Sequence, residues 1–162
     1  MRARPEARRA PAREGGVLVS QVHQLSGRVF AAVLKRHGIR ELNPAQGRIV
    51  YELWKQDGIT QTELATRTKL DKSTLALMLD RLEDQGHILR RADSADGRRR
   101  LVELTDKNRA MHAAYAAASQ DMAAVFYKNL TDRQIEQFES TLRVIMGNLE
   151  EQISRRRTSA PT

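Results

Sequence analysis

The stretch Thr60–Thr105 reads TQTELATRTKLDKSTLALMLDRLEDQGHILRRADSADGRRRLVELT, and it decides the fold. Thr60 followed by Glu63 forms a capping-box pattern, in which Glu63 can reach back to the amide of Thr60. This pattern predicts the start of a short helix. Asp71 is the predicted N-cap of a second helix, and Gly86 is a suitable residue to end it. The first half of the stretch therefore predicts a helix-turn-helix.

A β-hairpin is predicted directly after the second helix. Two short apolar runs, 88–89 and 101–104, are expected to be its strands. The segment between them, RRADSADGRRR, holds five arginines and two aspartates, and it has turn chemistry at Asp93–Gly97. A tip of this composition is suited to solvent or to phosphates. A helix-turn-helix followed by such a wing is a unit that presents a helix to a groove of DNA.

Helices are predicted on both sides of this stretch. A first helix is expected from about 17 to 37, ending at Gly38, and a second begins at Asn43–Pro44, an N-cap followed by a proline. After the hairpin we expect one helix from about 105 to 128 and a last one beginning at Thr131. The apolar stripe of this last helix is close to a heptad repeat; it consists of Ile135, Phe138, Leu142, Ile145, Leu149 and Ile153.

The predicted fold is mainly α, a winged helix-turn-helix whose N- and C-terminal helices form a dimerisation domain. The predicted parts are a disordered basic tail at 1–14, dimerisation helices at 15–42 and 106–154, the winged domain at 43–105 and a polar tail at 155–162. The long amphipathic end helices carry more apolar surface than a small middle domain can cover. This favours a two-fold dimer over the alternative, an intramolecular bundle.

Composition narrows the classes of function. Apolar residues make up 40% of the chain and aromatic residues only 4%, which favours helices, and cysteine is absent, which excludes disulfides and thiolate catalysis. No continuous apolar run in the sequence approaches the length of a membrane span. We therefore predict a cytoplasmic protein without a membrane partner. Of the net charge of +8, the tails at 1–14 and 155–157 carry +3 each. The high pI is therefore weak evidence for nucleic-acid binding, since solvated tails account for most of it.

Nothing in the sequence indicates catalysis or a cofactor. There is no glycine-rich phosphate loop, no nucleophile elbow and no metal-ligand spacing among the four histidines. We therefore predict a protein that is not an enzyme and that holds no metal.

The motifs resemble those of the MarR family of bacterial transcriptional regulators. The similar segments are NPAQGRIVYELW, GITQTELATRTKL, STLALMLDRLEDQGHILR, Asp96-Gly97-Arg98 and the strand end LVELT, within a match from about Val17 to Ile153. The resemblance implies a homodimer that binds a short palindrome in double-stranded DNA, usually as a repressor. It also implies that a small aromatic or anionic effector releases this dimer from DNA. The runners-up are a helical protein-interaction scaffold and a nonspecific architectural DNA binder.

The resemblance also implies which residues contact DNA. Ser73 and Thr74 match the positions near the start of the recognition helix that contact DNA, and Lys72, which precedes them, can meet a phosphate. Arg98 matches a wing arginine that enters the minor groove, and Asp96 matches the carboxylate that orients it. Arg99 is a further candidate, although alternation along a strand lets at most one of Arg99 and Arg100 share the face of Arg98.

The recognition helix departs from the family pattern. Ala76 and Leu77 stand where many members have a polar residue and an arginine, so an expected reader of guanine is missing. Leu77 either faces the groove, where it can touch thymine methyl groups, or turns into the core. Arg81 either contacts DNA or pairs with Asp80 or Asp84 on the surface.

The resemblance also implies an effector pocket between the dimerisation helices and the winged domain. Its candidates are His23 on the first helix and Arg48, Tyr51 and Trp54 on the second. They would combine an apolar body with polar anchors. For Trp54, ordinary core packing is the alternative.

Overall fold

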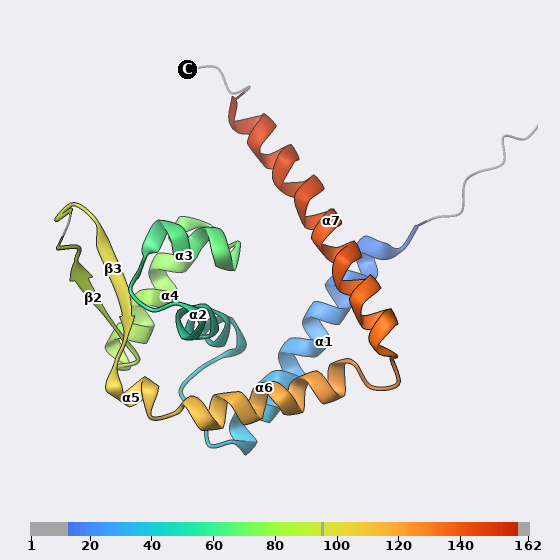
Figure 1. The fold of residues 1–162 in the computed structure, drawn as a ribbon, viewed down its shortest axis with the longest axis horizontal. Helices are drawn as coiled ribbons and strands as arrows, with labels where there is room; N and C mark the ends of the chain where they lie inside the picture. Colours follow the sequence, from blue (N-terminus) through green and yellow to red (C-terminus); the bar gives the residue numbers. More distant parts are fainter. Residues whose placement is uncertain (1–12, 95, 159–162) are drawn as a thin grey trace, which may run out of the picture. The chain divides into compact units, whose positions relative to one another are not determined.

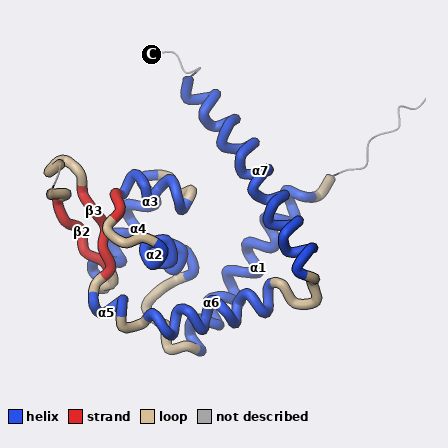
Figure 2. The backbone as a smooth tube through the Cα atoms, in the orientation of Figure 1, coloured by secondary structure: helices blue, strands red, loops and turns tan. Residues whose placement is uncertain are grey.

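The computed structural model describes residues 13–94 and 96–158. The chain forms two compact units that meet in sequence between Met122 and Ala123. The first holds the helix-turn-helix and all the strands that the structure describes, and the second is mainly one long helix (Figures 1 and 2). The mainly α fold with a winged helix-turn-helix is confirmed. Most of the two predicted tails, residues 1–12 and 159–162, lies outside the described residues.

The predicted elements occur in the predicted order. The observed elements are α1 (Gly15–Arg36), α2 (Pro44–Lys55), β1 (Ile59–Thr60), α3 (Gln61–Thr68), α4 (Lys72–Asp84), β2 (Ile88–Ala92), β3 (Arg100–Leu104), α5 (Asp106–Arg109), α6 (His112–Phe126) and α7 (Asp132–Thr158). Of these, β1 and α5 are additional to the predicted elements.

The predicted helix boundaries rest on local hydrogen bonds. Asn43 and Gln46 form a complete capping box at the start of α2, with bonds of 2.9 and 3.1 Å in the two directions. Gly86 ends α4 with a φ of +72°, and the amide of His87 then donates to the carbonyl of Leu82 over 2.8 Å. This left-handed glycine with a bond back across the turn is a Schellman motif. The sequence signals at these ends were therefore correct.

The sheet contains a strand that the sequence did not indicate. Its order is β1-β3-β2, with antiparallel pairing throughout. The two-residue strand β1 pairs Ile59 with Val102, and it is too short to show alternation. In β2 the pairing continues to Ala92, which lies opposite Arg100, so this strand is longer than the predicted 88–89. The added pairs tie the base of the wing to the start of α3.

The apolar core lies inside the first unit. Leucines 75, 79 and 82 of α4 are completely buried, as are Ile49, Val50 and Leu53 of α2. Val102 of β3 and Leu64 of α3 close the same cluster. The spacing of these residues at three and four positions places them on the inner face of each helix. The winged domain therefore buries its own apolar residues within one chain.

The helix predicted from about 105 to 128 is interrupted. Thr105 caps the short helix α5, and α6 begins only at His112. The hydroxyl of Thr105 donates to the carbonyl of Gly86 over 2.6 Å, and Asn108 of α5 is completely buried. These long-range contacts fix the first turn separately from the helix that follows. The local sequence pattern of α6 does not indicate these long-range contacts.

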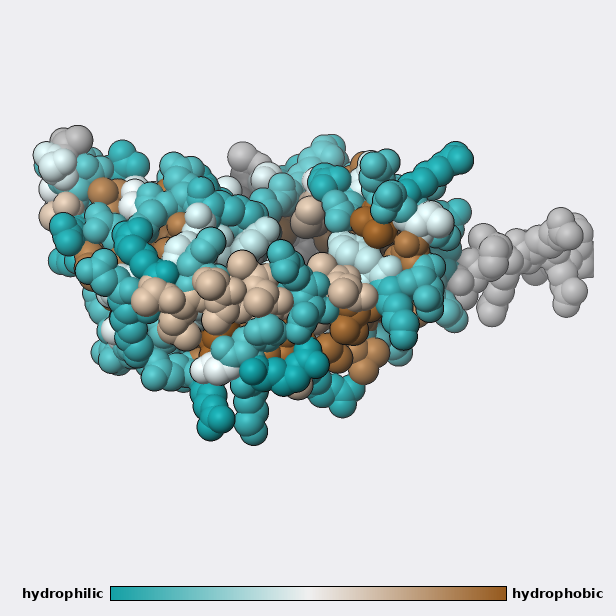
Figure 3. Space-filling view, turned by 60° about the horizontal axis from the view of Figure 1, so that its bottom comes forward, coloured by the Kyte–Doolittle hydropathy of each residue, from teal (hydrophilic) through white to brown (hydrophobic). Residues whose placement is uncertain are grey.

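The two end helices contrast with this core. In α1 and α7 most of the large apolar side chains are exposed, although Val33 and Leu34 of α1 belong to the core. Figure 3 shows apolar groups, in brown, reaching the surface on the face that it presents. The exposed apolar side chains include Val17, Leu18, Val22 and Leu25 of α1 and Val144, Met146, Leu149 and Ile153 of α7. Each helix keeps an apolar stripe that its own unit leaves open.

One sequence-based expectation about α1 was wrong. Among the described residues, α1 has the length and mean hydropathy of a helix that could cross a membrane. The expectation rested on the lack of a continuous apolar run, since the apolar residues of α1 are interspersed with Ser20, Gln21, His23 and Gln24. Such polar side chains are costly in hydrocarbon. Length and composition alone do not separate a membrane span from an apolar helix that packs against protein.

Candidate nucleic-acid interface

Helix α4 is held at its start by the side chain of Asp71. Its carboxylate accepts hydrogen bonds from the amide of Thr74, over 2.8 Å, and from the hydroxyl of Thr74, over 2.5 Å. These bonds hold the pKa of the Asp71 carboxyl below its ordinary value. Of the predicted contact residues, Lys72 and Ser73 are exposed, whereas Thr74 is half-buried. The hydroxyl of Thr74 is engaged in the cap.

The outward face of α4 carries Leu77. Its side chain is 64% exposed, so the alternative in which it enters the core is wrong. Arg81 lies one turn further along the same face and is also exposed. Asp80, one of the two carboxylates offered as an alternative partner for Arg81, instead accepts a hydrogen bond of 2.7 Å from Arg90. Pairing of Arg81 with Asp84 stays an alternative to DNA contact.

The tip of the wing is ordered by Asp96. Its carboxylate accepts a hydrogen bond of 3.0 Å from the backbone amide of Arg98, and its carbonyl accepts one of 2.8 Å from the amide of Arg99. The sequence-based prediction was that Asp96 orients the guanidinium of Arg98. In the structure its hydrogen bond to Arg98 is made with the main chain. The guanidinium stays exposed at the end of a fixed turn.

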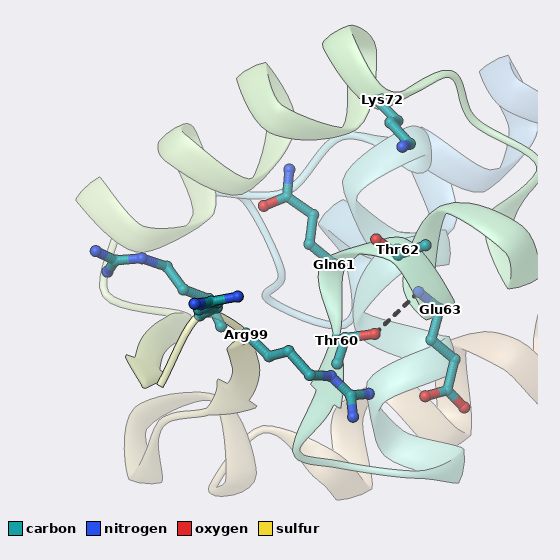
Figure 4. Close-up of a pocket in the computed structure, with 8 residues that line it drawn as sticks. Thr60, Gln61, Thr62, Glu63, Lys72 and Arg99 are labelled. Atoms are coloured by element: carbon teal, nitrogen blue, oxygen red, sulfur yellow. Dashed lines mark hydrogen bonds between the residues drawn. The ribbon is translucent and has the colours of Figure 1, made fainter. Parts of the chain in front are cut away.

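A basic hollow opens between the wing and the start of α3 (Figure 4), and we call it the wing hollow. It encloses about 710 Å³, and its lining residues are Thr60, Gln61, Thr62, Glu63, Lys72, Arg98, Arg99 and Arg100. In Figure 4 Lys72 reaches in from α4, and Gln61 and Thr62 come from the first turn of α3.

All three wing arginines line the wing hollow, which contradicts the expectation from strand alternation. The reason is that β3 begins only at Arg100, so Arg98 and Arg99 belong to the turn and do not alternate.

The wing hollow is predominantly cationic. Glu63 is its single carboxylate among the lining residues, and this carboxylate accepts a hydrogen bond of 2.5 Å from Arg67. The predicted reach of Glu63 back to Thr60 is thus replaced by a salt bridge, while Thr60 accepts from the amide of Glu63 over 3.2 Å. Four cationic side chains remain beside the first turn of a helix, a combination that attracts phosphate.

A second hollow, of about 540 Å³, adjoins the other end of α4, and we call it the α1–α2 hollow. Its cationic lining residues are Lys35, Arg40 and Arg81, and Glu41 also lines it. The carboxylate of Glu41 accepts a hydrogen bond of 2.6 Å from Lys107. Basic side chains therefore lie near both ends of α4.

Comparison with known proteins decides the family. The model of the MarR family matches residues 42–99. Transcriptional regulator HosA of Escherichia coli is 31% identical over 112 residues, which are 69% of this chain and 83% of HosA. The chain belongs to the MarR family. It is thus a DNA-binding transcriptional regulator.

Two further comparisons agree with this assignment. HTH-type transcriptional regulator TtmR of Methylorubrum extorquens is 36% identical over 85 residues, and the match spans 52% of this chain but only 42% of TtmR. A solved structure of a mutant MarR from Escherichia coli, complexed with operator DNA, is 27% identical and superposes with a TM-score of 0.72. That superposition covers 80% of this chain and 91% of the other.

This MarR-family chain contains a buried polar network that the sequence did not predict. His87 is completely buried, and its Nε2 donates to Glu41 over 3.1 Å. Its Nδ1 accepts from the amide of Asn108 over 3.1 Å. Glu41 belongs to the loop between α1 and α2, while Asn108 belongs to α5, so the network joins both connections into the winged domain. Separations of 46 and 21 residues leave no local pattern.

The network sets the protonation state of its members. Burial, followed by the positive charge of Lys107, holds the pKa of His87 below its ordinary value, although Glu41 acts in the opposite direction. The hydrogen bond from Lys107 lowers the pKa of Glu41. The lowered pKa favours the neutral form of the His87 ring. In this form Nε2 can donate to the Glu41 carboxylate while Nδ1 accepts from Asn108.

The predicted effector residues are not gathered in either hollow. His23, Arg48 and Tyr51 are exposed, and the ammonium of Lys55 lies 4.3 Å from the centre of the Tyr51 ring. Trp54 is half-buried, with its ring centre 4.4 Å from that of His112. Among the described residues, no group of three or more histidine, aspartate or glutamate side chains could hold a metal ion.

Proposed function

We propose that this regulator binds a short palindromic operator as a homodimer, represses transcription there and releases DNA when a small aromatic or anionic compound binds. The observation that carries the proposal is the wing hollow beside the exposed face of α4. The sequence specificity, the dimer and the effector each rest on separate features of the chain.

In the proposed complex α4 enters the major groove. Lys72 and Ser73 lie at its start, and the wing hollow beside them receives backbone phosphates through Lys72 and Arg99. Arg98 extends from the ordered turn into the adjacent minor groove, whose negative potential favours a guanidinium. The hydrogen bond that the Arg98 amide donates to Asp96 supports this role, because it fixes the backbone from which Arg98 extends.

The exposed stripes of the end helices support the homodimer. Leu149 and Ile153 of α7 are each 60% exposed in the single chain, and Val17 of α1 is also 60% exposed. An exposed apolar stripe along one helix usually marks a protein interface. A second copy would cover it, and a two-fold dimer presents two α4 helices to two half-sites of a palindrome.

The effector proposal rests on Trp54. Its indole nitrogen is buried and has no hydrogen-bond partner among the described residues. Such a donor is rarely left without an acceptor. A carboxylate or phenolic oxygen would supply one, and His23, Arg48 and Tyr51 are the proposed polar and aromatic companions of the ligand.

DNA binding is tested on duplexes recovered by selection from a random pool and on the DNA upstream of the protein's own gene. We expect a palindromic sequence to be bound at least about a hundredfold more tightly than a scrambled duplex at the same salt concentration. Equal affinity for both duplexes would instead favour a nonspecific architectural binder. Absence of binding to any duplex would favour a protein-interaction scaffold.

The effector is tested by fluorescence, because Trp54 is the only tryptophan in the sequence. A panel of phenolic and other aromatic acids is titrated against the protein, and the same compounds are added to the operator complex in gel shifts. We expect at least one acid to change Trp54 emission and to release DNA over the same concentration range. A compound that releases DNA without changing the emission would place the effector site elsewhere.

A further inference from the structure

Leu77 is a large apolar side chain at the middle of the outward face of α4. It is 64% exposed, whereas its neighbours Leu75 and Leu79 are fully buried. An isolated exposed leucine needs no explanation on an ordinary surface. Here it stands on the helix that the proposed function assigns to the major groove.

The polar groups around Leu77 are engaged with other protein groups. The hydroxyl of Thr74 donates to Asp71, and the carboxylate of Asp80 accepts from Arg90. Asp80 is also close to Glu83, which Arg90 binds over 2.5 Å. Leu77 is therefore the large side chain that this part of α4 offers to a ligand, beside the small Ser73 and Ala76.

Charge on both sides of Leu77 indicates the kind of ligand. Lys72, five residues earlier, lines the wing hollow with three arginines. Arg81, four residues later, lines the α1–α2 hollow with Lys35 and Arg40. An apolar group between two basic regions complements a DNA major groove, which has phosphates along both edges and the thymine methyl as its apolar group.

We propose that Leu77 packs against the C5-methyl group of a thymine in each half-site and so selects A·T over G·C at that base pair. This rests on the proposed function of operator binding. A protein partner is disfavoured, because one leucine between cations is far smaller than the apolar patches of several hundred Å² that mark such interfaces.

The test removes the methyl group from DNA and the side chain from the protein. In a selected operator, each thymine is replaced in turn by deoxyuridine, which keeps every base-pair hydrogen bond. We expect one symmetric position at which the replacement weakens binding about fourfold per half-site, as expected for one lost methyl contact. Leu77→Ala should bind the normal operator with a similar loss and be insensitive to deoxyuridine at that position.

Two further variants sharpen the test. Leu77→Arg should shift the selected base toward guanine, since arginine pairs with the major-groove edge of guanine. Ser73→Ala serves as the matched control on the same face and should keep the sensitivity to deoxyuridine. Thermal melting of Leu77→Ala should match the original protein, because the side chain is exposed.

The outcomes separate this inference from the function on which it rests. If selection yields no preferred duplex, the proposed function fails. If selection succeeds but no thymine is sensitive, or if Leu77→Ala keeps the sensitivity, operator binding stands and the contact assigned to Leu77 is overturned. Capture of a protein at Leu77 with unchanged DNA affinity would also overturn it.

Discussion

The winged domain and the end helices use apolar residues in opposite ways. Leu75, Leu79 and Leu82 of α4 are completely buried within one chain, whereas Leu149 and Ile153 of α7 are each 60% exposed. Both sets follow helical spacing, so periodicity alone does not distinguish them. The difference teaches that the DNA-reading part is complete in one chain, while the end helices are built to be covered by something else.

The largest expected effect tests the completeness of the winged core. Leu79→Ala should lower the free energy of unfolding by about 2–5 kcal/mol, because it leaves a cavity among fully buried side chains. Leu77→Ala, two residues earlier on the exposed face of the same helix, is the matched control and should change it by less than about 0.5 kcal/mol. Urea unfolding followed by circular dichroism measures both. Equal effects would contradict the assigned faces of α4.

The next effect concerns the wing. Arg98→Ala should weaken operator binding by about 1–3 kcal/mol, through loss of a groove contact. Arg133→Ala removes the same charge from an exposed position on α7 and should leave the affinity nearly unchanged. Fluorescence anisotropy at a fixed salt concentration compares them. A loss shared by both variants would indicate a nonspecific charge effect.

A smaller effect is expected from pH. Because the folded state lowers the pKa of His87, unfolded chains bind protons more readily than folded ones as pH falls below about 6.5. The free energy of unfolding should therefore decrease in this range. Glu41, whose pKa is also lowered, stabilises the fold above its ordinary pKa and loses this contribution only at more acidic pH.

His87→Gln isolates the histidine in that experiment. Glutamine can donate to Glu41 and accept from Asn108 but does not titrate. The dependence of stability on pH between about 6.5 and 5 should therefore become flatter. An unchanged slope would assign the effect to another group.

The smallest effect belongs to the N-terminal tail. Removing residues 1–14 takes away five arginines, so the affinity for DNA should depend less steeply on salt. The preferred sequence should stay the same. A changed preference in repeated selections would show that the tail reads bases.

The sequence predicted features whose causes are local. Asn43–Pro44, Asp71 and Gly86 marked helix ends correctly, because caps and left-handed turns depend on residues a few positions apart. The order of the predicted helices and strands followed from these signals, whereas the resemblance to the MarR family rested on the sequence motifs.

The remaining features depend on contacts between distant residues. Strand β1 exists through its pairing with β3, and the break after α5 accompanies the burial of Asn108 against His87. In the candidate site, the exposure of Leu77 was one of two alternatives that only the packing of α4 could decide. The gathering of Arg98, Arg99 and Arg100 depends on where the turn gives way to β3.

Sedimentation equilibrium of the full chain tests the comparison most directly. We predict a particle of twice the chain mass of 18.4 kDa at micromolar concentration, and dissociation when Leu149→Asp places a charge on the exposed stripe of α7. The variant should keep the helical content of the folded chain while losing affinity for the palindrome. A monomeric original protein that still binds the palindrome at full affinity would contradict the account.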